Sequence, residues 1–260
     1  MPRYALLIEY DGTPYVGYQV QNNGPSVQSA VEAALRIVAY GKQGPRIDTV
    51  AAGRTDSGVH ALGQVVHLDF PFAIPPANLR KALNALLDPS IRIRKVATVG
   101  NDFHARYFAR AKEYLYRVDL SDYPDPFKRF YTLHHPYSCD LARLEQALPA
   151  IIGPHDFTSF CSTKTDKTDL VRTIYQARVD YQPELNELHF HFYGNGFLYN
   201  MVRILVGTLL QIGDGLKAIN ELERLLAVKD RRQAGPTAAP QGLYMVRVDY
   251  PTDPFANNLY

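Results

Sequence analysis

The sequence predicts an α+β fold of two ferredoxin-like (RRM-like) halves, whose strands form a mainly antiparallel sheet flanked by helices. Apolar runs and helical spacings follow the order βαββαβ over the first hundred residues. The same order, with one further helix, returns in the second half as βαββααβ. Because no low-complexity linker separates the two, we expect one continuous body with its halves at residues 1–105 and 106–260.

In the first half, the period of the apolar residues separates strands from helices. Val27, Val31 and Leu35 recur at helical spacing, and Ser26 before them is a suitable N-cap. Short β-branched runs on both sides of a glycine-containing loop predict two strands. The predicted elements span, in order, residues 4–10, 27–38, 47–52, 64–70, 79–87 and 91–99.

In the second half, Pro183 lies in a turn that joins two strands. Pro149 is expected to end or kink its helix, because proline lacks a backbone N–H and clashes with the preceding turn. The predicted elements span residues 112–120, 140–152, 170–181, 187–193, 197–212, 216–228 and 243–250.

Composition is that of a globular protein, with 46% hydrophobic and 21% charged residues. The most apolar stretch, 197–213, is interrupted by Asn200 and Arg203, whereas a membrane span needs roughly 18 apolar residues in a row. The N-terminus runs directly into strand-like sequence without a signal peptide. Cys139 and Cys161 are too few and too isolated for a disulfide framework or a zinc site. We therefore expect a cytoplasmic protein with no metal site.

Charge is unevenly distributed along the chain. The whole sequence carries only +2, which by itself does not indicate a nucleic-acid-binding protein. The segment from Arg80 to Arg117, however, holds nine basic and three acidic residues, a net +6, which leaves −4 for the remainder. Such a run is either a solvated, salt-bridged face or a track that binds phosphates.

One loop between two predicted strands carries a candidate catalytic group. Gly53 and Gly58 bracket Arg54, Thr55 and Asp56 there, and glycine allows sharp turns and close approach of a ligand. A carboxylate at such a tip is well placed as a nucleophile or base. The commoner interpretation is an aspartate that bonds its own turn.

Arg203 favours the catalytic interpretation. It lies in a predicted helix that is apolar on nearly every side, and such a helix is normally buried. An arginine there must reach the surface or meet a carboxylate, because an unpaired buried charge is very costly. Asp56 is a candidate partner, and a neighbouring arginine would keep that carboxylate ionised.

The segment GRTDSGVHALGQVVH resembles the catalytic motif of the tRNA pseudouridine synthase A family. Similar segments cover almost the whole chain: IEYDGTPYVGYQ, DFHARY, AKEYLYRV, HDFTSF, VRTI, FLYNMVRILVG and GLYMVRVDYP. The resemblance implies a pseudouridine synthase fold and isomerisation of uridine to pseudouridine at positions 38, 39 and 40 of the tRNA anticodon stem-loop. It also implies a homodimer that needs no cofactor.

The resemblance assigns roles to individual residues. Asp56 matches the catalytic nucleophile, and Arg203 matches the basic residue paired with it. Tyr114 matches the tyrosine that packs on the target base and is a proposed proton acceptor. Leu243 matches the apolar wall of the pocket, and Arg54 matches the arginine that assists base flipping.

Further expectations concern the RNA. Arg106 and Arg110, in the basic segment, are expected to bind tRNA in a salt-sensitive manner. Asp56 either adds to the base at C6 or acts at the ribose, and the sequence does not decide between these. Tyr18 stands where many family members carry tryptophan, so we expect altered packing there rather than lost catalysis.

Two other functions are compatible with the residues taken without the resemblance. A non-catalytic RNA-binding protein with two RRM-like halves fits the fold and predicts that Asp56→Asn leaves function intact. A carboxylate glycosidase would need a second acid in a comparable loop, which is missing. His189 and His191 share one strand face but are more typical of ordinary histidines than of a metal site. The loop 121–138 is either an inert insertion or a tRNA-contacting arm.

Overall fold

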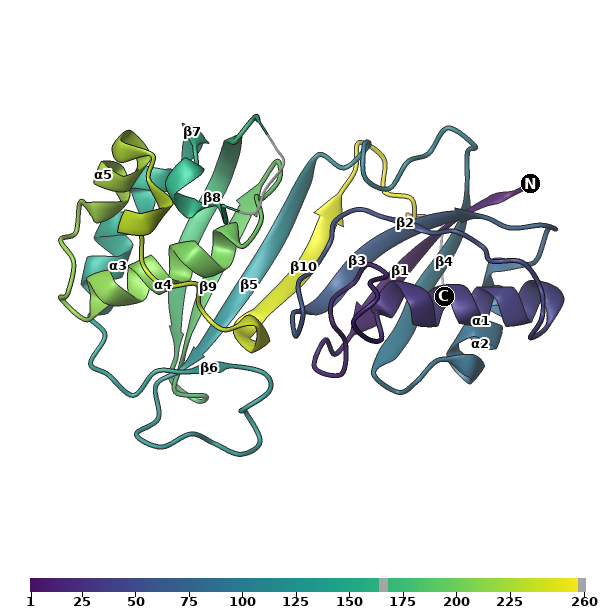
Figure 1. Cartoon of the computed structure of the whole chain (residues 1–260), viewed down its shortest axis with the longest axis horizontal. Helices are drawn as coiled ribbons and strands as arrows, with labels where there is room; N and C mark the ends of the chain where they lie inside the picture. The colour runs from purple at the N-terminus through teal and green to yellow at the C-terminus, as the bar shows by residue number, and fades with distance from the viewer. Residues whose placement is uncertain (164–167, 257–260) are drawn as a thin grey trace. The chain divides into compact units, whose positions relative to one another are not determined.

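The computed structural model describes residues 1–163 and 168–256. The chain divides into two compact units (Figure 1). The first unit comprises Met1–Arg110 and Met245–Tyr260, and the second comprises Ala111–Tyr244.

The C-terminal part of the chain is where these units differ from the predicted halves, 1–105 and 106–260. Residues from 245 onward belong to the first unit. They do so because strand β10 (Leu243–Asp249) lies beside β3 (His60–Asp69) in the sheet. Sequence order alone does not reveal a strand that returns to the unit in which the chain began.

The first unit consists of an antiparallel sheet and two helices. Its elements before the C-terminal strand are β1 (Arg3–Tyr10), α1 (Val27–Tyr40), β2 (Val50–Ala51), β3, α2 (Pro76–Leu86) and β4 (Ile91–Val99). β1 is central and pairs antiparallel with both β3 and β4, while β2 pairs antiparallel with β3. The two helices contact each other, and α2 packs against β4.

Burial on both faces explains why β1 is a continuous apolar run. Tyr4, Leu6 and Ile8 are buried in the core, and Ala5 joins a second cluster that includes Phe103. The predicted N-cap Ser26 is confirmed, since its side chain accepts a hydrogen bond from the backbone N–H of Ser29, 3.1 Å away, in a capping box. β3 begins earlier than predicted because its pairing with β1 reaches back to Ala61.

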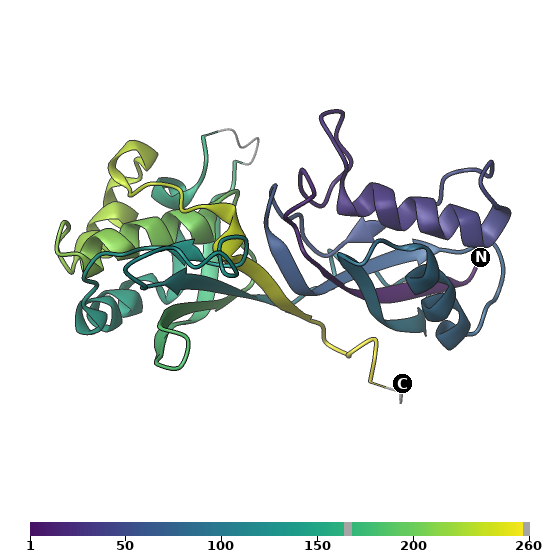
Figure 2. The ribbon, with the colours of Figure 1, turned by 90° about the horizontal axis from the view of Figure 1, so that it is seen from below.

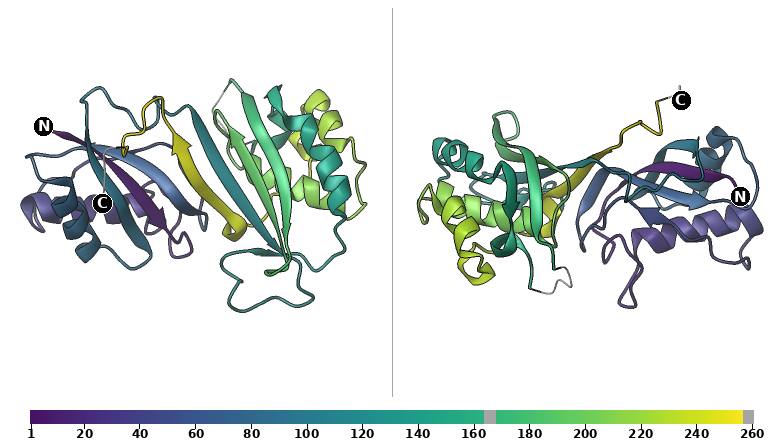
Figure 3. Two further views of the ribbon diagram at one scale, coloured as in Figure 1. Left: turned by 180° about the vertical axis from the view of Figure 1, so that it is seen from behind. Right: turned by 90° about the horizontal axis from the view of Figure 1, so that it is seen from above.

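The second unit has helices on one face of a mainly antiparallel sheet, as Figure 3 shows. The strand order is β5-β9-β8-β7, and β6 pairs with β5 in parallel. Its strands are β5 (Ala111–Asp119), β6 (Leu133–His134), β7 (Gly153–Asp156), β8 (Val171–Gln182) and β9 (Glu187–Gly194). Its helices are α3 (Leu141–Ala147), η1 (Leu148–Ile151), η2 (Thr158–Phe160), α4 (Met201–Gly213), α5 (Glu221–Val228), η3 (Arg231–Gln233) and η4 (Pro240–Gly242).

Helix boundaries in this unit depart from the apolar pattern at specific residues. Helix α4 begins at Met201 rather than at 197, because Asn200 has a left-handed backbone with φ of 61°. Helix α5 begins later than predicted, after a turn at Gly215 with φ of 76°. As predicted for Pro149, the α-helix α3 ends and the tighter helix η1 follows.

The predicted α+β fold class is confirmed, since both units combine helices with sheets in which antiparallel pairing prevails. The most apolar helix, α4, has 13 residues. Of the helices in the described residues, none is both long and apolar enough to cross a membrane.

Candidate active site

The loop that carries Asp56 is held by side chains of the first unit's core. It connects β2 to β3, and the carbonyl oxygen of its Gly53 accepts a hydrogen bond from Gln64 Nε2 at 2.7 Å. The hydroxyls of Tyr10 and Thr55 lie 2.8 Å apart within hydrogen-bond distance. Burial raises the pKa of Tyr10 to about 12, so its hydroxyl stays neutral and can donate to or accept from Thr55. The residues on the N-terminal side of Asp56 are therefore fixed to the sheet.

A second loop, residues 11–25 (Figure 2), also contacts this turn. The backbone N–H of Tyr18 donates to the carbonyl oxygen of Thr55 at 3.0 Å, and Gly17 forms a β-bridge with Asp56. Gly17 has φ of 117°, and a Cβ there would lie 2.8 Å from the Thr55 carbonyl oxygen. This close approach requires glycine, so the IEYDGTPYVGYQ segment supports the loop that carries Asp56.

Tyr18 belongs to the core beneath the loop. Its side chain is 2% exposed and packs against Tyr10 with ring centroids 6.3 Å apart. Burial raises the pKa of the Tyr18 hydroxyl. The position where many family members carry tryptophan is thus filled by an aromatic ring that supports the loop through packing.

Asp56 itself is partly exposed at the tip of the turn. Its backbone carbonyl accepts a hydrogen bond from the N–H of Val59 at 3.1 Å, which closes the turn. Arg54, Arg106 and Arg110, the other predicted site residues of this unit, are exposed. The first unit therefore presents a fixed carboxylate and three arginines at its surface.

The predicted basic track is partly neutralised within the protein. Arg94 Nε lies 3.1 Å from Glu9 Oε1 in the first unit. In the second unit, Arg117 donates two hydrogen bonds, of 2.9 and 3.0 Å, to the fully buried carboxylate of Glu187. Arg94 and Arg117 are thus paired with carboxylates inside their own units. Arg106 and Arg110 remain the residues predicted to bind phosphate.

In the second unit, Arg203 projects from the first turn of α4 and is held by two acceptors. Its Nε donates to the carbonyl oxygen of Ala238 at 2.7 Å, and its Nη1 donates to Asn200 Oδ1 at 2.8 Å. Asn200 is not among the site residues that the sequence predicts. Its position three residues before an arginine in an apolar helix was the available signal, since such residues are neighbours on a helix surface.

Tyr114 and Leu243 are the other predicted site residues of the second unit. Tyr114, on β5, is 8% exposed, and its ring meets the edge of Phe197 at a centroid distance of 4.9 Å. Leu243, at the start of β10, is buried. Asp56 belongs to one unit and Arg203 to the other, so the ion pair between them stays a prediction.

The second unit also holds a group of potential metal ligands that sequence spacing did not reveal. Ligand atoms of His135, Cys139 and Asp214 all lie within 4.8 Å of one another. The Nε2 of His135 is 2.8 Å from Asp214 Oδ1, a hydrogen-bond distance. Burial raises the pKa of the Cys139 thiol to about 12, so it is protonated at neutral pH. The arrangement is that of a partly buried hydrogen-bonded pair beside a neutral thiol.

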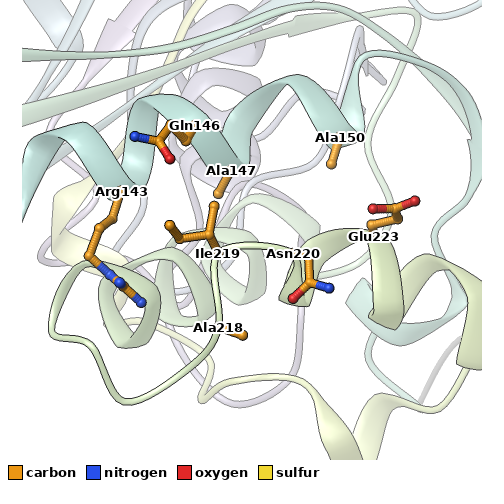
Figure 4. Close-up of a pocket in the computed structure, with 8 residues that line it drawn as sticks. All are labelled: Arg143, Gln146, Ala147, Ala150, Ala218, Ile219, Asn220 and Glu223. Atoms are coloured by element: carbon orange, nitrogen blue, oxygen red, sulfur yellow. The ribbon is translucent and has the colours of Figure 1, made fainter.

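A cavity of about 410 Å³ lies between α3, η1 and the start of α5 (Figure 4). Arg143, Asn220 and Glu223 contribute its polar groups, and alanine side chains line much of the remainder. It contains none of the predicted site residues. The predicted site residues lie instead on loops of the first unit, at the start of α4 and on strands β5 and β10.

Comparisons with known proteins agree with the motifs on these loops. The model of the family described as tRNA pseudouridine synthase matches residues 6–108 and 147–251. A tRNA pseudouridine synthase A of Lacticaseibacillus casei is 50% identical over 250 residues, which are 96% of this chain and 100% of that protein. A protein of the same name from Geobacillus kaustophilus is 46% identical over 257 residues, 99% of this chain and 98% of that one. The chain therefore belongs to the tRNA pseudouridine synthase family, which confirms the resemblance.

Proposed function

We propose that this protein isomerises uridine to pseudouridine at positions 38, 39 and 40 of the tRNA anticodon stem-loop, with Asp56 as the nucleophile. The observation that carries the proposal is the fixed turn around Asp56. Backbone and side-chain hydrogen bonds from β1, β3 and the loop 11–25 hold this turn, while its aspartate remains partly exposed. A nucleophile needs both a defined position and access to substrate.

The reaction is an isomerisation, so its atoms balance without an added reactant. The C1′–N1 bond breaks, the uracil turns while it is held, C5 bonds to C1′, the proton on C5 leaves, and N1 takes up a proton. Asp56 acts at C6 of the base or at the ribose, and either route requires the ionised carboxylate. Arg203 supports ionisation by charge proximity, and Tyr114 packs on the base and accepts the proton.

The target base must first leave the stem, which costs a few kcal/mol. Arg54 is exposed on the same turn as Asp56, so it enters the RNA beside the nucleophile and fills the gap left by the base. Arg106 and Arg110 bind the phosphates. Leu243 supplies an apolar contact to the uracil.

A homodimer in the cytoplasm is part of the same proposal. The loop 121–138 extends from the second unit (Figure 3) and exposes large aromatic side chains, with Tyr123 83% and Phe127 87% exposed. It is anchored, since Lys128 Nζ lies 3.2 Å from the buried carboxylate of Glu187. Its two acidic and two basic residues cancel, so the surface suits a protein better than a phosphate backbone. A molecular mass in solution equal to one chain would contradict the dimer.

The central experiment measures tritium release from tRNA that carries C5-tritiated uridine. The wild-type protein is expected to release tritium, and Asp56→Asn is expected to release none, because an amide is not a nucleophile of comparable strength. Equal release from both proteins would favour a role for Asp56 in structure alone. Absence of release from both would leave the non-catalytic RNA-binding alternative, which a tRNA-binding measurement identifies.

A further inference from the structure

Asn200, immediately before α4, has two unusual features. Its backbone is left-handed, with φ of 61° and ψ of 8°, a conformation that few residues other than glycine adopt. As the N-cap of α4 it also makes no side-chain hydrogen bond to the helix backbone. An asparagine cap normally accepts from the second or third backbone N–H of its helix, and that bond contributes about 1 kcal/mol.

The side chain of Asn200 is used instead to hold an arginine. Its Oδ1 accepts a hydrogen bond from Arg203 Nη1 at 2.8 Å. The backbone carbonyl of Asn200 still accepts from the N–H of Ile204 at 2.9 Å, so the helix begins normally while the amide points to the guanidinium. The capping interaction has been exchanged for a contact with Arg203.

The second acceptor of Arg203 is rigid because its segment packs directly on α4. The N–H of Ala238 donates back to the carbonyl oxygen of Arg203 at 3.1 Å, which makes the contact reciprocal. The N–H of Gly235 donates to Thr208 Oγ1 at 3.0 Å. A Cβ on Gly207 would lie 2.0 Å from the Pro236 carbonyl oxygen, so only glycine allows the segment to approach this closely.

The two acceptors therefore come from different segments and bind different nitrogens of one planar group. A guanidinium has five N–H donors in a fixed geometry, so two bonds to fixed oxygens define its plane and direction. Asn200 is suited to this role because its oxygen is uncharged. A carboxylate at the same place would neutralise the cation that Asp56 is proposed to use.

We propose that Asn200 is a positioning residue, which orients the Arg203 guanidinium for its interaction with the Asp56 carboxylate. The inference rests on the proposed function, in which Arg203 is the partner of the nucleophile. Asn200 acts through Arg203 and leaves the affinity for tRNA to other residues.

The test uses Asn200→Gly, which keeps the left-handed backbone and removes the amide. We expect kcat for tritium release to fall about 10- to 100-fold, a range typical of a misplaced catalytic group. KM for tRNA and Tm should stay near the wild-type values, because glycine adopts this backbone without strain. The matched control is Asn186→Gly, since Asn186 has φ of 52° in the β8–β9 turn and its side chain accepts from the Tyr181 hydroxyl at 3.0 Å. The control should keep the wild-type kcat.

A double-mutant cycle shows whether Asn200 acts through Arg203. In an Arg203→Lys background, Asn200→Gly should change kcat little further, because the oriented guanidinium is already gone. An unchanged kcat for Asn200→Gly, or an equal loss in both backgrounds, would overturn the inference while Asp56→Asn still tests the proposed function. A wild-type protein without tritium release would overturn both.

Discussion

The turn that carries Asp56 and the helix start that carries Arg203 are positioned by different means. Backbone hydrogen bonds and the close approach of Gly17 fix Asp56, with Thr55 as the main anchoring point. Side-chain bonds to Asn200 and the Ala238 carbonyl fix Arg203. An aspartate has a short side chain, so a fixed backbone nearly fixes its carboxylate. Arginine has a long side chain that loses much rotamer freedom when it is ordered, so its head group must be held directly.

We therefore expect substitutions near Asp56 and at Arg203 to affect activity and stability differently. The largest loss of activity is expected at Arg203. Arg203→Met removes the cation and keeps an unbranched side chain, so tritium release should fall below detection while the fold is kept. The oxygens that held the guanidinium lose their donors, at a cost of about 1–3 kcal/mol. Activity and thermal denaturation measured on one sample separate the two effects.

Arg143→Met is the matched control for that variant. Arg143 also donates to backbone carbonyls of the second unit, those of Ile212 at 2.8 Å and Lys217 at 2.9 Å. Its loss should lower Tm comparably and leave kcat close to wild type. Full activity of Arg203→Met would disprove the proposed partnership with Asp56.

A smaller effect, on both stability and activity, is expected from Gly17→Ala. The φ of 117° is unfavourable for alanine, and the new Cβ would meet the Thr55 carbonyl oxygen at 2.8 Å. We expect a loss of about 1–3 kcal/mol in the free energy of unfolding, measured by denaturant titration, and a lower kcat because the turn shifts. Gly41→Ala supplies the comparison, since Gly41 has φ of 80° and its Cβ would meet no atom within 4 Å. If both variants have the same kcat, contact with the loop does not position Asp56.

The smallest effect is expected at the surface arginines. Arg106→Ala or Arg110→Ala should weaken tRNA binding and reduce the slope of log Kd against log salt concentration by about one each. Arg94→Ala is the control, because Arg94 is paired with Glu9 at 3.1 Å and should alter the slope less. Binding that is independent of salt in the wild-type protein would refute the electrostatic contribution.

The local spacing of apolar residues was sufficient to predict many of the helices and strands. Helical spacing and Ser26 predicted the start of α1, and β4 spans the predicted residues. The pattern placed the start of α4 at 197, because Phe197 and Leu198 are as apolar as the helix that follows. The left-handed backbone of Asn200, whose side chain binds Arg203, is not visible in the period of the apolar residues.

The residues of the candidate site also fall into those that the sequence pattern predicts and those that only the structure reveals. The place of Asp56 in a loop between two strands could be predicted because glycines next to an aspartate are a local signal, while its role as nucleophile stays a prediction. Asn200 and the support from Gly17 could not, because their partners are defined by contacts rather than by residue type. The same reason explains why Arg117 appeared to belong to a phosphate track and instead forms an ion pair with buried Glu187.

The sequence by itself determined the α+β class, the family and the place of Asp56 in a glycine-bracketed loop between two strands, since these depend on composition, periodicity and short motifs. Only the tertiary structure decided that the last strand returns to the first unit, that Gly17 supports the Asp56 turn and that Asn200 holds Arg203. Each of these depends on hydrogen-bonding groups meeting at about 3 Å, and a linear pattern carries no information about which groups those are.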